Sequence, residues 1–312
     1  MIFEVLGEDQ NIRLDRFLVS KLEIYSRSQI QKLIKDGFIL VNNKKTTPHC
    51  FLKVGDKVTI DRQQSTDNNQ QTTIDSNKSN HFNNINIIKE QSDYLVLEKP
   101  AGLLVHPDQV HQEPTLIDWL LKHKPLIAKV GDNPLRPGIV HRLDREVSGL
   151  MVIAKTQEMF EHLKSQFKQR KIRKEYLVLV HGAVLRDEFE VNLPIGRSKS
   201  GYFVAQTNGQ KEAKTASTEF EVVRRFKTNT LLKAVLKTGR THQIRVHLKS
   251  QGHSIVGDKL YQTRDLKNKK NSFLMRPFLH SHILGFFDLE NNWQEFKSDL
   301  SQDLNNFLRE LK

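Results

Sequence analysis

A long polar stretch divides this chain of 312 residues into two parts. Residues 63–84 consist almost entirely of Gln, Asn, Ser, Thr and Asp, with almost no large apolar side chain. Such a segment cannot bury enough apolar surface to offset the entropy that it would lose on ordering. We therefore expect a flexible polar linker at 63–84, which joins one domain at 1–62 to a second at 85–312.

The charge of the chain indicates a polyanionic partner. Lys and Arg number 49 against 36 Asp and Glu, which gives a net charge of +13 at pH 7. This excess favours nucleic acid or an acidic membrane over a neutral metabolite. No apolar run reaches the roughly 20 residues of a spanning helix, and the first six residues do not resemble a signal peptide. We expect a cytoplasmic monomer without a membrane partner.

Residues 1–62 have the pattern of a small α+β domain. Apolar residues between 14 and 22 recur at helical spacing, and a second such run would end at Gly37. Runs at 38–41 and 57–60 are typical of short strands. Basic side chains on the polar side of this domain would suit an RNA backbone, and these are Arg13, Arg16, Arg27, Lys32, Lys44 and Lys45.

The second part predicts an α+β domain with a mixed, mainly antiparallel sheet, flanking helices and a central cleft. It has no regular strand and helix repeat and no Gly-rich phosphate loop, so doubly wound and P-loop folds are disfavoured. Helical patterns cover 116–121 and 156–170. Strand-like runs cover 94–97, 149–154, 176–180, 218–223 and 231–236.

One acidic motif dominates this second part. Residues 138–150 read GIVHRLDREVSGL and place Asp144 between Arg142 and Arg145. Nearby positive charge favours the ionised form of a carboxylate, which suits a nucleophile better than a proton donor. For such a string taken alone, an ordinary surface ion pair is the alternative, because charged residues are mostly exposed.

The motif and three further stretches together resemble the RluA-type pseudouridine synthases. These stretches are EKPAGLLVHP at 98–107, RKEYLVLVHG at 173–182 and TGRTHQIRVHL at 238–248, and they follow one another in the family's order. Residues 13–43 are also similar to the RNA-binding module named after ribosomal protein S-four. The resemblance implies an isomerase that acts on RNA and needs neither a metal nor a cofactor.

The resemblance also implies the roles of individual residues. Asp144 would be the nucleophile, attacking carbon 6 of the base or carbon 1 of the ribose. The target uridine must leave its stack; Arg142 would take its place and Tyr176 would stack on the base. Arg245 would orient Asp144 through two hydrogen bonds. Further basic residues would contact phosphates, and these are Lys168, Arg170, Lys171, Arg173, Lys174, Arg240 and Lys249.

Several alternatives remain open on the sequence alone. The most favoured substrate is 23S large-subunit ribosomal RNA, with transfer RNA as the alternative, and a non-catalytic ribosome-assembly factor would share the composition. A metal-dependent nuclease is suggested by histidines such as His280 and His282, but no acidic cluster accompanies them and no metal site is expected. Val147 stands where the family usually has Thr, which removes a hydroxyl near Asp144.

Overall fold

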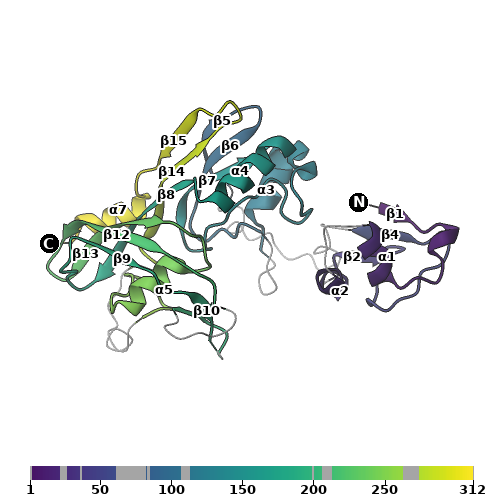
Figure 1. The fold of residues 1–312 in the computed structure, drawn as a ribbon, viewed down its shortest axis with the longest axis horizontal. Coiled ribbons are helices and arrows are strands. Elements are labelled where there is room, and N and C mark those ends of the chain that lie inside the picture. Colours follow the sequence, from purple (N-terminus) through teal and green to yellow (C-terminus); the bar gives the residue numbers. More distant parts are fainter. Residues whose placement is uncertain are drawn as a thin grey trace, which may run out of the picture. The chain divides into compact units, whose positions relative to one another are not determined.

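Two compact units make up the protein. The computed structural model describes residues 2–21, 27–35, 37–60, 82, 85–106, 113–198, 200–205, 213–262 and 274–311. The smaller unit is Met1–Ile74 and the larger unit is Asp75–Lys312 (Figure 1). The linker expected at 63–84 lies outside the described residues, apart from Phe82. No helix among the described residues is long and apolar enough to cross a membrane.

The smaller unit packs two helices on a four-stranded antiparallel sheet with the strand order β1-β4-β2-β3. Its core contains Leu14, Phe17, Leu18 and Ile30, which are fully buried and lie on the helix faces that the sequence pattern predicts. The elements are β1 (Ile2–Glu4), η1 (Gly7–Asp9), α1 (Leu14–Lys21), α2 (Arg27–Lys35), β2 (Ile39–Val41), β3 (Lys44–Lys45) and β4 (Lys57–Ile60).

The larger unit is built on a nine-stranded mixed sheet. Its main path is β5-β6-β7-β14-β8-β13-β12-β9, and β15 pairs with β14. The contact between β7 and β14 is parallel, whereas the other strand pairs are antiparallel, so the expected fold class is confirmed. The strands are β5 (Asn86–Glu90), β6 (Tyr94–Lys99), β7 (Ser148–Ala154), β8 (Arg173–His181), β9 (Glu188–Val191), β12 (Thr218–Arg225), β13 (Asn229–Leu236), β14 (Leu279–Phe287) and β15 (Trp293–Lys297).

Helices cover both faces of this sheet because its strands are apolar on both sides. Leu95 and Leu97 of β6 belong to one core cluster, which includes residues of α3, α5 and α7. Tyr94 and Val96 point to the opposite face and belong to the cluster that contains α4. The helical elements are α3 (Leu116–His123), η2 (Pro125–Lys129), α4 (Gln157–Gln169), α5 (Gln243–Ser250) and α7 (Gln302–Arg309); a hairpin of β10 (Ile195–Arg197) and β11 (Phe203–Ala205) pairs separately.

A close contact between β7 and β14 fixes the segment that carries Asp144. Gly149 has a φ of +114°, and a Cβ atom there would lie 2.3 Å from the carbonyl oxygen of Ser281. Only glycine allows this approach. Ser281 faces Gly149 on one side and Tyr176 of β8 on the other. The end of the Asp144 motif and Tyr176 therefore lie on β7 and β8, the two strands that flank β14.

Candidate active site

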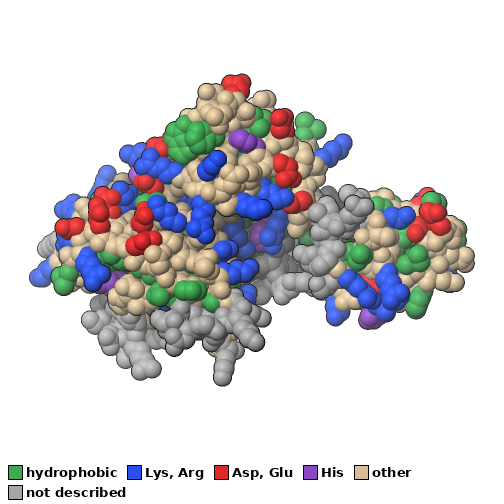
Figure 2. Space-filling view, in the orientation of Figure 1, with side chains coloured by type: hydrophobic (Ala, Val, Ile, Leu, Met, Phe, Trp, Pro, Cys, Tyr) green, Lys and Arg blue, Asp and Glu red, His purple; other side chains and the backbone are tan. Residues whose placement is uncertain are grey.

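A basic cavity of about 640 Å³ opens in the larger unit. Its lining comes from the segment before β7, the end of α4, the start of β8 and the region that leads into α5. Figure 2 shows Lys and Arg side chains gathered at a hollow in the face of this unit. Among the described lining residues Asp144 is the one carboxylate, and the cations are Arg136, Arg142, Lys168, Arg170, Lys174, Lys237, Arg240 and Arg245.

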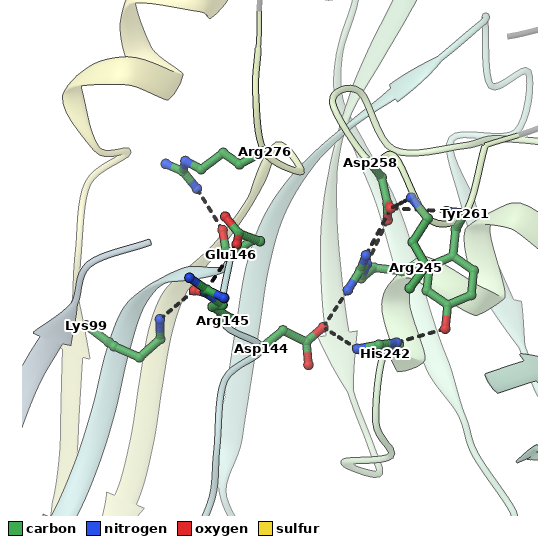
Figure 3. A network of polar contacts seen from close by, with 10 residues as sticks. Lys99, Asp144, Arg145, Glu146, His242, Arg245, Asp258, Tyr261 and Arg276 are labelled. Carbon is green, nitrogen blue, oxygen red and sulfur yellow. Dashed lines mark hydrogen bonds and ion pairs between the residues drawn. The ribbon is translucent and has the colours of Figure 1, made fainter. Parts of the chain in front are cut away.

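Asp144 is largely buried in this cavity, with 17% of its side chain exposed. Its Oδ2 accepts a hydrogen bond of 3.2 Å from Nη1 of Arg245 and lies 3.8 Å from Nε2 of His242 (Figure 3). Arg145, which the sequence places beside Asp144, instead donates to the carbonyl of Gly102 and to the carboxylate of Glu113. Arg145 is therefore paired elsewhere, and Arg245 is the arginine that forms an ion pair with Asp144.

Arg245 directs its paired N–H groups at Asp258 rather than at Asp144. Its Nε lies 2.7 Å from Oδ2 and its Nη2 lies 2.9 Å from Oδ1 of Asp258, whose side chain is fully buried. Burial alone would lower the pKa of Arg245, but the hydrogen bonds and charge of Asp258 outweigh it and raise that pKa. The expected pair of hydrogen bonds to Asp144 is thus corrected to one, because Asp258 fixes the guanidinium from behind.

His242 forms a second support for Asp144. Its Nδ1 lies 2.8 Å from the hydroxyl of Tyr261, while its Nε2 faces Asp144. Burial lowers the pKa of His242 below its usual value and raises that of Tyr261 to about 12, so a neutral phenol faces a neutral imidazole near pH 7. His242 has a φ of 56° at the start of α5. This left-handed conformation is uncommon for a residue with a side chain and is often found at functional sites.

Asp258 and Tyr261 belong to one turn, which the sequence analysis did not connect with Asp144. Gly257 begins the turn with a φ of +78°, and a Cβ atom there would lie 2.0 Å from the carbonyl oxygen of Arg276. The Tyr261 ring also packs under the Arg245 guanidinium, whose central carbon is 4.9 Å from the ring centre. The signal in the sequence was weak: a single acid in the otherwise mostly apolar string SIVGDKLY.

Tyr176 lies in the cavity wall on β8. It is buried, with 7% exposed, and burial raises the pKa of its hydroxyl. Val147 belongs to the same apolar cluster and is 2% exposed. The valine in place of the family's usual threonine therefore packs in apolar surroundings that require no hydroxyl.

The side chains predicted to contact RNA differ in their exposure and in their partners within the protein. Arg142 is exposed at the cavity, with Nη1 3.3 Å from Nε2 of His106. Arg240 also lines the cavity and donates to the carbonyl of Thr215. In the smaller unit, Arg13 and Arg27 both pair with the fully buried Asp15. Arg16, Lys44 and Lys45 are exposed, and the side chain of Lys32 lies outside the described residues.

Lys99 joins two loops beneath the site and was not singled out from the sequence. Its ammonium group is buried and donates to the carbonyls of Pro100, Leu103 and Arg145 at 2.7, 2.8 and 3.0 Å. Burial lowers its pKa to about 7, opposed by the charge of Asp144. The three hydrogen bonds tie the turn after β6 to the residue that follows Asp144.

The histidines that suggested a metal site have other partners. His280 lies between the hydroxyls of Ser148 and Ser298, at 2.9 and 3.0 Å. His282 contacts the carbonyl of Ser298. Within the described part of the chain, no three His, Cys, Asp or Glu side chains are grouped so that they could bind a metal ion.

Comparison with known families matches both units. A family model described as RNA pseudouridylate synthase matches residues 93–250, and an S4 domain model matches residues 12–58. The first match contains all four sequence motifs, at 98–107, 138–150, 173–182 and 238–248, and ends before Asp258 and Tyr261. The second match falls within the smaller unit.

Similar proteins cover nearly the whole chain. An uncharacterized RNA pseudouridine synthase of Aquifex aeolicus is 37% identical over 305 residues, which are 95% of this chain and 92% of that protein. The ribosomal large subunit pseudouridine synthase C of Buchnera aphidicola from Acyrthosiphon pisum is 33% identical over 98% of this chain and 96% of its own length. Synthase D of Nitrosomonas europaea is 38% identical over 80% of this chain and 69% of its own length.

A solved structure agrees with the fold. The human RNA pseudouridylate synthase domain containing 4 superimposes with a TM-score of 0.57 and 24% identity. The match covers 73% of this chain and 94% of the human chain.

Proposed function

Because this chain belongs to the RNA pseudouridylate synthase family, we propose that it isomerises uridines of 23S ribosomal RNA with Asp144 as nucleophile. The enzyme is an RNA pseudouridine synthase, and RNA is its partner. The observation that carries the catalytic proposal is the position of Asp144. It is the one carboxylate among the described lining residues of a cavity with eight cations, and Arg245 contacts it directly.

The chemistry explains why a lone carboxylate suits this site. Pseudouridine forms when the bond between the base and the ribose breaks, the base turns, and carbon 5 bonds to the ribose in place of nitrogen 1. Nitrogen 1 gains a proton and carbon 5 loses one, so the reaction needs no oxidant. Attack by Asp144 on carbon 6 of the base or carbon 1 of the ribose would split one hard step into two easier steps.

The cavity also accounts for the detached base. A uridine inside a stacked stem must be flipped out at a cost of a few kcal/mol. Stacking on Tyr176 would return about 1–3 kcal/mol, the usual worth of a base on an aromatic ring. Arg142, exposed at the cavity, would occupy the gap in the RNA. Burial raises the pKa of the Tyr176 hydroxyl, so this side chain stays neutral beside the carboxylate of Asp144.

Support for ribosomal RNA comes from two sources. Relatives over most of the chain are named ribosomal large subunit pseudouridine synthases, and the smaller unit matches the S4 domain. We propose that the smaller unit, at 1–62, selects a large folded RNA, and that 85–312, as a monomer, performs the chemistry. Transfer RNA remains the second candidate substrate.

Mapping pseudouridines in total RNA, with and without the gene, tests the substrate. The proposal expects specific positions in 23S ribosomal RNA to lose pseudouridine when the gene is deleted and to regain it with the wild-type gene. Loss confined to transfer RNA would overturn the ribosomal assignment. No loss in either RNA would overturn the proposed function.

A further inference from the structure

Two adjacent basic residues of β8 lie on opposite faces of the sheet. Arg173 donates to Glu175 at 2.9 and 2.7 Å and to Glu295 at 2.8 Å. Lys174 and Tyr176 line the cavity instead. Side chains two apart on a strand share a face, and successive ones alternate. The sequence grouped Arg173 and Lys174 as equal RNA contacts, but Lys174 is the one in the cavity wall.

Lys174 has no carboxylate within ion-pair distance among the described residues. Its Nζ lies 5.7 Å from the centre of the Phe167 ring. Burial lowers its pKa to about 8, and the positive charge of Arg170 contributes in the same direction. A half-buried cation beside another cation is costly unless an anion approaches. This wall of the cavity is therefore suited to an anion.

Several other ionisable side chains share the cavity wall with Lys174, whose pKa is about 8. His141, on the segment before β7, is neutral because burial lowers its pKa to about 3. Its Nε2 accepts a hydrogen bond from the backbone of Val152. On β14 the partner of Lys174 is the apolar Leu284. The remaining charged or titratable residues of the cavity wall are His106, then Lys168 and Arg170 at the end of α4, Arg136 and Arg142 before β7, Asp144, Tyr176 on the same strand, Lys237 after β13, and Arg240, His242 and Arg245 at the start of α5.

We propose that Lys174 binds a backbone phosphate of the nucleotide whose base stacks on Tyr176. The two side chains are two residues apart on one strand, a separation of about 7 Å along the sheet. They can thus receive the base and the backbone of the same flipped nucleotide. A lysine ammonium is a good point-charge partner for phosphate. This inference rests on the proposed function, since it places the uridine on Tyr176.

The site has a pH signature of definite sign. In the free protein Lys174 loses its proton near pH 8, whereas a bound phosphate raises the pKa of the ammonium. RNA binding therefore takes up a proton above about pH 8, so affinity falls as the pH rises from about 8 to 10. An arginine at this position would stay charged throughout that range and would remove the dependence.

Fluorescence anisotropy with a labelled RNA stem–loop that has one uridine in its loop tests the proposal, using the full chain. Lys174→Gln is expected to weaken binding by about 10- to 100-fold, the usual loss for a charged hydrogen bond. It should also reduce the slope of log affinity against log salt by about 0.7–0.9. Lys174→Arg should restore the affinity without its pH dependence. Lys227→Gln is the matched control, since it removes one exposed positive charge that does not line the cavity.

A second probe tests which phosphate is bound. Replacing the phosphate next to the loop uridine by an uncharged methylphosphonate should weaken wild-type binding but not the Lys174→Gln variant further. Equal losses in both proteins, or Lys174→Gln behaving like Lys227→Gln, would overturn the inference. Tritium release by the wild-type protein is measured on the same RNA labelled at carbon 5. Its absence would refute the proposed function, whereas the binding data would still decide on Lys174.

Discussion

Asp258→Asn tests whether Arg245 must be fixed from behind to orient Asp144. The Asp258 carboxylate is fully buried and accepts from Nε and Nη2 of Arg245 and from the backbone N–H groups of Leu260 and Tyr261. An asparagine oxygen in the position of Oδ1 can keep three of these four bonds. The amide NH₂ then faces the Nε–H of Arg245, so one charged bond is replaced by two opposed donors.

The magnitude follows from burial. Breaking a buried ion pair by removing one charge costs about 3–5 kcal/mol, and the bonds that asparagine retains place the expected loss near the lower limit, about 3 kcal/mol. Without its fork to Asp258, Arg245 is free to turn toward Asp144. A displacement on the order of 1 Å at a reacting group can slow a reaction about 100-fold. RNA affinity should change little, because Asp258 does not line the cavity.

Three measurements on one protein preparation separate these effects. Single-turnover tritium release at saturating protein gives the rate, anisotropy gives the RNA affinity, and urea denaturation gives the stability. Asp132→Asn is the control, because it removes the same charge from an exposed ion pair with Lys164 at 2.6 Å. Such a surface pair contributes less than about 1 kcal/mol to the free energy of unfolding. If Asp258→Asn lost stability but isomerised uridine at the wild-type rate, Asp258 would support the fold without orienting Asp144.

The remaining predictions use the same assays. Arg245→Lys keeps the charge but loses the fork, so the single-turnover rate should fall at least about tenfold at similar RNA affinity; a wild-type rate would make Arg245 a simple phosphate contact. Lys99→Met leaves three carbonyls without their donor and should lower the free energy of unfolding by about 3 kcal/mol. The pKa of Lys99 in the folded protein, about 7, lies below that of free lysine, so the unfolded protein binds more protons at this group. The free energy of unfolding of the wild type should therefore rise between pH 7 and about 10. Urea titrations of the methionine variant should lack that rise. Deleting residues 1–84 should leave the rate on a short stem–loop unchanged, weaken binding to long ribosomal RNA, and flatten the salt dependence by about 0.7–0.9 per lost phosphate contact; a collapse of the stem–loop rate would mean that the smaller unit helps to form the active site.

Strands that are apolar on both faces could be predicted from the sequence alone. The runs at 94–97 and 149–154 became β6 and β7 because neighbouring strands and helices bury both of their faces. The strand β14 was missed, since it is interrupted by polar residues such as His280 and Ser281. Their partners, Ser148, Ser298 and the carbonyl of Leu150, are far away in the sequence. Such polar residues look exposed until the tertiary structure supplies their hydrogen bonds.

For the candidate site, the sequence predicted which residues belong to it but not which partners they bind. The motifs named Asp144, Tyr176 and Arg245, and the structure places all three at one cavity. The sequence could not show that Arg245 donates its paired hydrogen bonds to Asp258, or that Arg145 donates to Glu113 rather than to Asp144. Both outcomes depend on where the turn at Gly257 and the segment before α3 lie in space. Strand alternation could have separated Arg173 from Lys174, but only if the boundaries of β8 had been known.

The central claim, that Asp144 is the nucleophile of this pseudouridine synthase, is tested most directly by tritium release from RNA labelled at carbon 5 of uridine. Release follows loss of the carbon 5 proton and reports the isomerisation itself. Asp144→Asn keeps the shape of the side chain but removes its nucleophilic charge, so the account predicts wild-type or tighter RNA binding with no release above background. Release by the asparagine variant at a rate near that of the wild type would show that another group performs the attack.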